Sequence, residues 1–258
     1  MNLSNMFWIE ARKALRSRMP LWTALGSLFM PLGIAFLIFV SRNPEVSQKL
    51  GLISAKANLL AYAGTDWPTY LGLFGQLLAA GGFGLFVLAI SWVFGREFVD
   101  GTLKDMLAVP VTRAGIVLAK FAVVAAWSLG LSILMLLFGL LMGAVIRLPG
   151  GSLAVLAHGG VLCVVTAVLT IIAVLPFALV ASMGRGYLLP ISVAVLMLMM
   201  TNVVALAGWG EYFPWAVPAF YSQGKIVLGP ASYWIVLLTG LAGILATYLW
   251  WKYADQNR

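Results

Sequence analysis

Residues 69–94 read TYLGLFGQLLAAGGFGLFVLAISWVF, twenty-six consecutive residues that include no charged side chain. A helix of about 20 predominantly apolar residues is long enough to cross the hydrocarbon core of a bilayer. This stretch therefore predicts a membrane-spanning helix. Five other stretches meet the same criterion, so the sequence predicts six spans, at residues 21–40, 69–94, 121–146, 153–182, 188–206 and 232–251.

The composition of the chain agrees with six spans. Of its 258 residues, 62% are hydrophobic and 9% are charged, whereas soluble domains are roughly 45–50% apolar. We expect an all-α polytopic membrane protein in which residues 1–258 form a single transmembrane domain. One histidine, eight acidic residues and one cysteine, Cys163, exclude a multi-histidine metal site and an internal disulfide.

The basic residues predict which way the chain crosses the membrane. With six spans both termini lie on one side, and that side carries eleven of the 16 Lys and Arg residues. Positive charge concentrates on the cytoplasmic side of membrane proteins. We therefore expect both termini in the cytoplasm, in a bacterial inner membrane, and expect the net charge of +8 to favour anionic lipids over nucleic acid.

A short amphipathic helix is predicted ahead of the first span. Apolar residues recur there at helical spacing, which is typical of a helix that lies in the headgroup layer. Pro20 suits the elbow between this helix and the span. The apolar positions are Phe7, Ala11, Ala14 and Leu15, the opposite face carries Glu10, Lys13 and Ser17, and Arg12, Arg16 and Arg18 flank them.

Two segments are predicted on the outer side. Residues 41–68 place Val46, Leu50, Ile53, Ala57 and Leu60 on one face, which favours an interfacial helix. Residues 207–231 contain GWGEYFPW at 208–215, and this composition is typical of a broken or re-entrant hairpin whose backbone neighbouring helices must cover. Glu211 is the only acidic residue there, and a structural role is favoured over attraction of a cationic substrate.

None of the candidate catalytic or nucleotide-binding motifs has the residues or the spacing that its chemistry requires. Gln223-Gly224-Lys225 is followed by Ile226 instead of Ser or Thr, so it does not make a phosphate-binding loop. Ser152 and His158 are six residues apart on one helix and lie on nearly opposite faces, which argues against a hydrolase. No acidic residue lies within the predicted spans, which argues against a proton-driven pump. Any ATP-driven role therefore needs a partner subunit.

The predicted cytoplasmic loop at 95–113 reads GREFVDGTLKDMLAVPVTR. Thr102 and Asp105 form a capping box, and Pro110 ends a helix of under two turns. Its apolar side, Leu103, Met106 and Leu107, suits docking into a groove on a cytoplasmic partner. The alternative is a helix that lies flat on the inner leaflet.

This loop resembles that of the type-2 ABC transporter permeases, a family that includes bacitracin- and lantibiotic-resistance permeases. The shared pattern is E-x-x-x-G-T-L-x-x-x-L-x-x-P-x-[ST]-R, with Lys120 opening the next span. Two weaker matches are Glu10 to Ser17 and Phe213 to Pro218. The residues that carry the loop pattern are Glu97, Gly101, Thr102, Leu103, Leu107, Pro110, Thr112 and Arg113.

The resemblance implies roles for three groups of residues and a path lined by spans one, two and five. Glu10, Arg12, Lys13 and Arg16 belong to a connecting helix. Glu97, Asp100, Gly101, Thr102, Leu103, Met106, Leu107 and Arg113 couple the chain to an ATPase, with residues 97–109 as the coupling helix. Glu211, Phe213, Pro214 and Trp215 form an outer gate.

The resemblance also implies the partners. Two permeases, identical or different, pair with two cytoplasmic ATPase subunits, and those subunits bind ATP and Mg, so this chain is expected to bind no cofactor. The leading function is an exporter subunit that moves an amphipathic or hydrophobic substrate outward. The alternatives are a nucleotide-independent carrier or channel, and a non-transporting assembly factor or membrane sensor.

Overall fold

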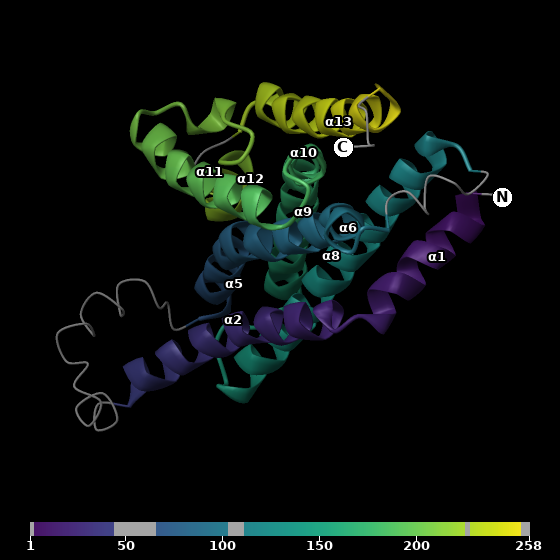
Figure 1. Cartoon of the computed structure of the whole chain (residues 1–258). Coiled ribbons are helices and arrows are strands. Elements are labelled where there is room, and N and C mark those ends of the chain that lie inside the picture. The colour runs from purple at the N-terminus through teal and green to yellow at the C-terminus, as the bar shows by residue number, and fades with distance from the viewer. Residues whose placement is uncertain (1–2, 44–65, 103–110, 225–227, 254–258) are drawn as a thin grey trace.

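The structure is a computed structural model that describes residues 3–43, 66–102, 111–224 and 228–253, and these residues fold into helices joined by short turns (Figure 1). Six helical segments are long and apolar enough to cross a membrane, which confirms an all-α polytopic membrane protein. The elements are α1 (Leu3–Arg16), α2 (Met19–Arg42), α5 (Trp67–Leu77), the π-helical η1 (Leu78–Gly82), α6 (Phe83–Val99), α8 (Arg113–Val145), α9 (Leu153–Val174), α10 (Phe177–Met183), α11 (Leu188–Leu206), the 3-10 helix η2 (Gly210–Tyr212), α12 (Val217–Gln223) and α13 (Pro230–Tyr253).

The predicted spans coincide with these helices, but two helices extend further toward the 103–110 segment than the apolar stretches do. α6 continues to Val99, five residues past the predicted end of the second span, and α8 begins at Arg113, eight residues ahead of the third. The Thr112 hydroxyl caps α8 by accepting a hydrogen bond from the backbone N–H of Gly115 at 3.2 Å. Both helices therefore carry charged residues beyond their apolar parts.

The second span is continuous but irregular, because α5 passes through the π-helical turn η1 before α6 begins. Two glycines end η1, and a Cβ atom placed on Gly81 would collide with the Met30 side chain of α2. Gly81 thus allows the second span to pack closely against α2. Single π-helical turns inside α-helices are rare and often occur at functional sites.

The helix of the fourth span is interrupted at Pro176. α9 ends at Val174 and α10 starts at Phe177, because proline donates no backbone hydrogen bond to the helix. α13 packs against this break through two glycines. A Cβ atom on Gly243 would stand 2.6 Å from the Cα of Pro176, and one on Gly240 would stand 3.0 Å from the Ile172 carbonyl oxygen.

Two glycines of α8 receive aromatic rings of α5. A Cβ atom on Gly143 would stand 2.5 Å from the Trp67 ring, and one on Gly139 would stand 2.9 Å from the Phe74 ring. The Tyr70 hydroxyl donates to the carbonyl oxygen of Gly139 at 2.7 Å. Small residues at these positions let the helices approach closely, as they do in many membrane bundles.

Burial divides the bundle into a centre and a periphery. α6 is the central helix and packs against α2, α8, α9, α10 and α11. α11 is peripheral, and only Pro190 and Ala194 are buried along it. Three predicted features lie outside the described residues: the apolar face of the interfacial helix within 44–65, the capping residue Asp105, and the docking side chains Leu103, Met106 and Leu107.

Candidate functional site

Four charged side chains from three helices meet next to Thr102, the last described residue before 103–110. Glu10 and Lys13 come from α1, Glu97 from the last turn of α6, and Lys120 from the second turn of α8. Lys120 is completely buried, and Glu97 and Glu10 are 3% and 4% exposed. We call these four residues the charge cluster.

Lys120 is the centre of the charge cluster. Its Nζ donates to Oε2 of Glu10 at 2.9 Å, to Oε1 of Glu97 at 3.2 Å and to the backbone carbonyl of Val93 at 3.0 Å. An ammonium group has three hydrogens to donate. All three are therefore used, so the buried side chain has no unsatisfied donor.

Lys13 closes the charge cluster from the more exposed side. Its Nζ lies 3.0 Å from Oε1 of Glu10 and 3.0 Å from Oε1 of Glu97. Burial alone would lower the pKa of Lys13, but the two carboxylates outweigh burial and the pKa is raised. The cluster thus contains two positive and two negative charges and is neutral as a unit.

The local sequence explains why these side chains converge. Glu10 and Lys13 are three residues apart, so both lie on one face of α1. α1 packs along α8, and α6 also packs along α8, so Lys120 lies between the two carboxylates. Moving one of these helices away would leave an unpaired buried charge, which is unfavourable. The cluster therefore holds α1, α6 and α8 in a fixed relation.

We call the described residues at Thr102 and at Arg113, on either side of 103–110, the two roots of the loop. The first root, at Thr102, is attached to the charge cluster. The Thr102 hydroxyl donates to Oε2 of Glu97 at 2.7 Å. Gly101 has φ +69°, a left-handed conformation that glycine adopts readily after a helix. One turn earlier, Arg96 pairs with Asp100 at 2.9 Å. These contacts determine where the chain leaves α6.

The second root is attached to α13. One guanidinium nitrogen of Arg113 donates to the backbone carbonyls of Trp251 at 2.8 Å and Lys252 at 2.9 Å. A cation is favoured beside the unpaired carbonyls of a helix C-terminus. Trp251 is itself buried and donates from its indole to the Ser182 hydroxyl at 2.9 Å. The two roots of the loop are thus connected to α1, α6, α8 and α13.

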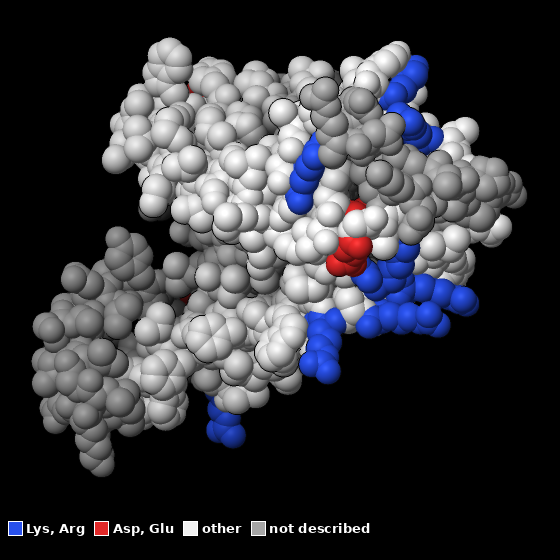
Figure 2. All heavy atoms as spheres, viewed as in Figure 1, with Lys and Arg blue, Asp and Glu red and all other residues white. Residues whose placement is uncertain are grey.

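The charged surface around the site is basic. Figure 2 shows Lys and Arg side chains gathered around α1, beside an acidic patch. The N-terminal end of α1 and the C-terminal end of α13 both point toward this end of the molecule (Figure 1). Arg12, Arg16 and Arg18 are exposed there.

The structure brings together some of the predicted residues and leaves others apart. Glu97, Gly101, Thr102 and the Arg96–Asp100 pair surround the first root, and Arg113 forms the second. Arg12 and Arg16 point to the surface instead.

Sequence reasoning missed the central role of Lys120. It also placed Glu10 and Lys13 on a face opposite the apolar side of a headgroup helix, but the structure turns both toward α6 and α8. The signal for Lys120 was present, because a lysine only seven residues after Arg113 lies at the edge of a long apolar stretch.

The predicted outer-gate residues include two aromatic side chains with defined contacts, Phe213 and Trp215. The Trp215 indole donates to the carbonyl oxygen of Ala173 at 2.9 Å, and the Phe213 and Trp215 rings are 5.2 Å apart. Ala173 lies twenty residues along α9 from its start at Leu153, so this segment reaches far along the fourth span. α12 then packs against α5 and α9. Neighbouring helices thus cover this segment, as the sequence predicts for a broken hairpin.

Three polar candidates lie at the predicted outer ends: Glu211, Ser152 and His158. Glu211 lies in η2, and a hydrogen bond to its carboxyl together with its charge raises the pKa of Tyr212. Ser152 is the N-cap of α9 and accepts from the backbone N–H of Val155 at 3.3 Å. His158 is exposed on the same helix.

Comparison with known proteins agrees with this architecture. Residues 6–202 match the family described as ABC-2 family transporter protein. The chain is similar to the bacitracin transport permease protein BCRB of Bacillus licheniformis, with 25% identity over 174 residues that cover 66% of this chain and 84% of that protein. No solved structure matches. Since the family match covers most of the chain, this protein belongs to the ABC-2 family and is a membrane permease subunit of an ABC transporter.

Proposed function

We propose that the chain is the permease of an ATP-driven exporter that moves an amphipathic or hydrophobic substrate outward. A separate ATP-binding subunit, which binds ATP and Mg, supplies the energy. The ABC-2 family match supports partnership with an ABC ATPase. The similarity to a bacitracin permease makes this amphipathic peptide the first substrate to test.

The observation that carries the proposal is the attachment of both roots of the 103–110 loop. Thr102 connects one root to Glu97 and so to the charge cluster, and Arg113 connects the other to the end of α13. Motion applied to the loop by a partner is therefore passed to α1, α6, α8 and α13 together. A loop that only rested on the lipid surface would need no such attachment.

Docking itself is assigned to the apolar side of the loop. We propose that Leu103, Met106 and Leu107 fill a groove on the ATP-binding subunit. Burying one such side chain contributes about 1.5–3 kcal/mol. Arg12 and Arg16 are exposed on α1 and are proposed to contribute to docking as part of the connecting helix.

Topology and assembly complete the proposal. Both termini, α1 and the loop roots are cytoplasmic, in agreement with the basic surface around α1 (Figure 2). Two permeases pair with two ATP-binding subunits. The first, second and fifth spans line the path, and the segment with Glu211, Phe213, Pro214 and Trp215 gates its outer end. The sparse burial of α11 in the single chain supports a further contact there.

The test compares two neighbouring substitutions in the loop. Leu103→Asp removes an apolar contact and places a charge in the proposed groove, whereas Lys104→Asp changes charge without removing an apolar side chain. We expect Leu103→Asp to abolish co-purification with the ATP-binding subunit, or to leave ATP hydrolysis uncoupled from bacitracin accumulation in inside-out vesicles. Lys104→Asp should retain both. Wild-type coupling in Leu103→Asp would contradict the proposal.

A further inference from the structure

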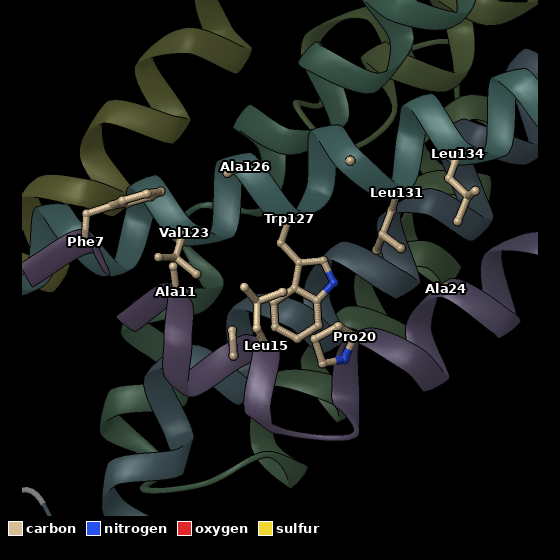
Figure 3. A pocket seen from close by; sticks show the side chains of 12 residues that line it. Phe7, Ala11, Leu15, Pro20, Ala24, Val123, Ala126, Trp127, Leu131 and Leu134 are labelled. Carbon is tan, nitrogen blue, oxygen red and sulfur yellow. The ribbon is translucent and has the colours of Figure 1, made fainter. Parts of the chain in front are cut away.

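A groove of about 380 Å³ lies between α1, the start of α2 and α8 (Figure 3). In Figure 3, Phe7, Ala11 and Leu15 of α1 point toward Val123 and Trp127 of α8. The side chains that line it are apolar, and its volume falls within the roughly 300–1,000 Å³ of ligand-binding pockets. We call it the elbow groove, because it lies beside the turn at Ser17 and Arg18.

The elbow groove has an open side and a deep side. Leu15 is 72% exposed, so the groove is accessible beside the elbow. Trp127 forms the opposite wall, and its indole donates to the Thr23 hydroxyl at 3.1 Å. Gly130 also lines the groove, and a Cβ atom placed on it would have no neighbour within 4 Å. The space beside Gly130 is therefore free.

Two arginines are close in the chain to residues that line this apolar space. Leu15 and Pro20, which line the groove, enclose Arg16 and Arg18 in the chain. Both arginines are exposed, and within the described ranges neither pairs with a carboxylate. An apolar groove with unneutralised arginines beside it is complementary to a molecule with a hydrocarbon tail and an anionic head.

We propose that the elbow groove binds one acyl chain of an anionic glycerophospholipid, with the phosphate beside Arg16 and Arg18. This lipid site goes beyond the proposed transport function. It has a structural consequence, because the same helix α1 carries Glu10 and Lys13 toward the charge cluster. A lipid in the groove and the cluster on another face together fix the angle of α1 against α8.

The first test measures lipid binding to the purified full-length chain in detergent. Native mass spectrometry counts bound dioleoylphosphatidylglycerol and, separately, dioleoylphosphatidylcholine. We expect the anionic lipid to bind more tightly. Gly130→Leu fills the free space and should reduce binding of both lipids at least tenfold. Gly160→Leu is the matched control, since a Cβ atom there also has no neighbour within 4 Å and Gly160 lies on α9, away from the groove.

The second test concerns the arginines, which lie on the surface and whose replacement leaves the core intact. A basic residue near an anionic surface contributes a factor of about five in affinity. Arg16→Gln combined with Arg18→Gln should therefore weaken phosphatidylglycerol binding by roughly 25-fold and weaken phosphatidylcholine binding much less, because the choline of that lipid offsets the charge of its phosphate. Equal binding of the two lipids to the unaltered chain would overturn the proposal for an anionic ligand.

A third measurement places the bound lipid. Phosphatidylglycerol with brominated acyl chains quenches nearby tryptophans, and Trp127, one of ten in the chain, lines the groove. Trp127→Phe should remove the part of the quenching that saturates with the bound lipid. Quenching that is identical in Trp127→Phe places the lipid elsewhere and overturns the proposal. The proposal would also be overturned if Gly130→Leu left lipid binding unchanged but converted a dimer to a monomer. That result would identify the groove as a contact between two copies of the chain.

Discussion

The Nζ atom of Lys120 lies 2.9 Å from Oε2 of Glu10, although 110 residues separate them in the chain. This ion pair joins the first helix to the third span in a fully buried position. Its strength depends on Glu97 and Lys13 as well, because a buried pair is favourable only when its remaining hydrogen-bonding groups are satisfied. The end of α6, α1 and the start of α8 are therefore held together by the four charges as a unit.

Replacing Lys120 with Met should destabilise the protein strongly. The change leaves Glu10 and Glu97 buried with only Lys13 between them, and breaking a buried ion pair costs about 3–5 kcal/mol. Thermal unfolding in detergent measures the effect. Lys252→Met is the control, because Lys252 is exposed. Arg113 donates to the backbone carbonyl of Lys252, which the substitution leaves in place. Equal melting temperatures of the two variants would show that the cluster adds no stability.

A second change should partly rescue the first. Glu10→Gln in the Lys120→Met background leaves one carboxylate for Lys13, so the cluster becomes neutral again. We expect Glu10→Gln to destabilise the unaltered chain but to stabilise Lys120→Met. A double-mutant cycle measures this interaction. Additive effects of the two substitutions would mean that the two side chains act independently.

Arg113→Gln should loosen the end of α13 and leave the rest of the bundle folded. The substitution removes the charged donor from the carbonyls of Trp251 and Lys252. Hydrogen–deuterium exchange should become faster in the last turn of α13 and stay unchanged in α6. Arg12→Gln is the control, since Arg12 is also exposed and contacts the Trp8 ring. Unaltered exchange in α13 would show that Arg113 does not stabilise the end of this helix.

Gly143→Leu should destabilise the contact between α5 and α8. A Cβ atom at this position would stand 2.5 Å from the Trp67 ring, and overfilling a packed site typically costs 1–3 kcal/mol. Gly33→Leu in α2 serves as the control, because a Cβ atom there has no neighbour within 4 Å. An equal fall of the melting temperature in both variants would attribute the effect to replacement of a helical glycine and not to the contact with Trp67.

The topology proposal predicts a labelling pattern. In a chain with Cys163 replaced by Ser, a single cysteine at Gln48 should react with a membrane-impermeant reagent in intact cells. A single cysteine at Gln256 should react only after the cells are opened. The reverse pattern would show the opposite orientation in the membrane, with the loop roots on the outer side.

The six spans were predictable because their signal is local. An apolar stretch of sufficient length must cross the membrane as a helix wherever its neighbours lie, and the break at Pro176 follows from a single residue. The π-helical turn at Leu78–Gly82 was not predictable in this way, since it occurs where the second span packs against α9, α12 and α2. Its position depends on tertiary packing.

The site was predictable only in its loop. The motif from Glu97 to Arg113 indicated the two roots, but the partner of each charge comes from a distant helix. Periodicity placed Glu10 and Lys13 on the polar side of α1 without showing whether that side faces water or protein. A helix face that pairs with buried charges has the same pattern as a solvated one.

The order of the four charges along the chain has a consequence for biosynthesis. Glu10, Lys13 and Glu97 all precede Lys120, so a chain made from its N-terminus presents both carboxylates before the lysine leaves the ribosome. The ammonium group of the third span thus meets waiting partners as it reaches the membrane. A reversed order would hold an unpaired lysine at the edge of the bilayer until later segments were translated.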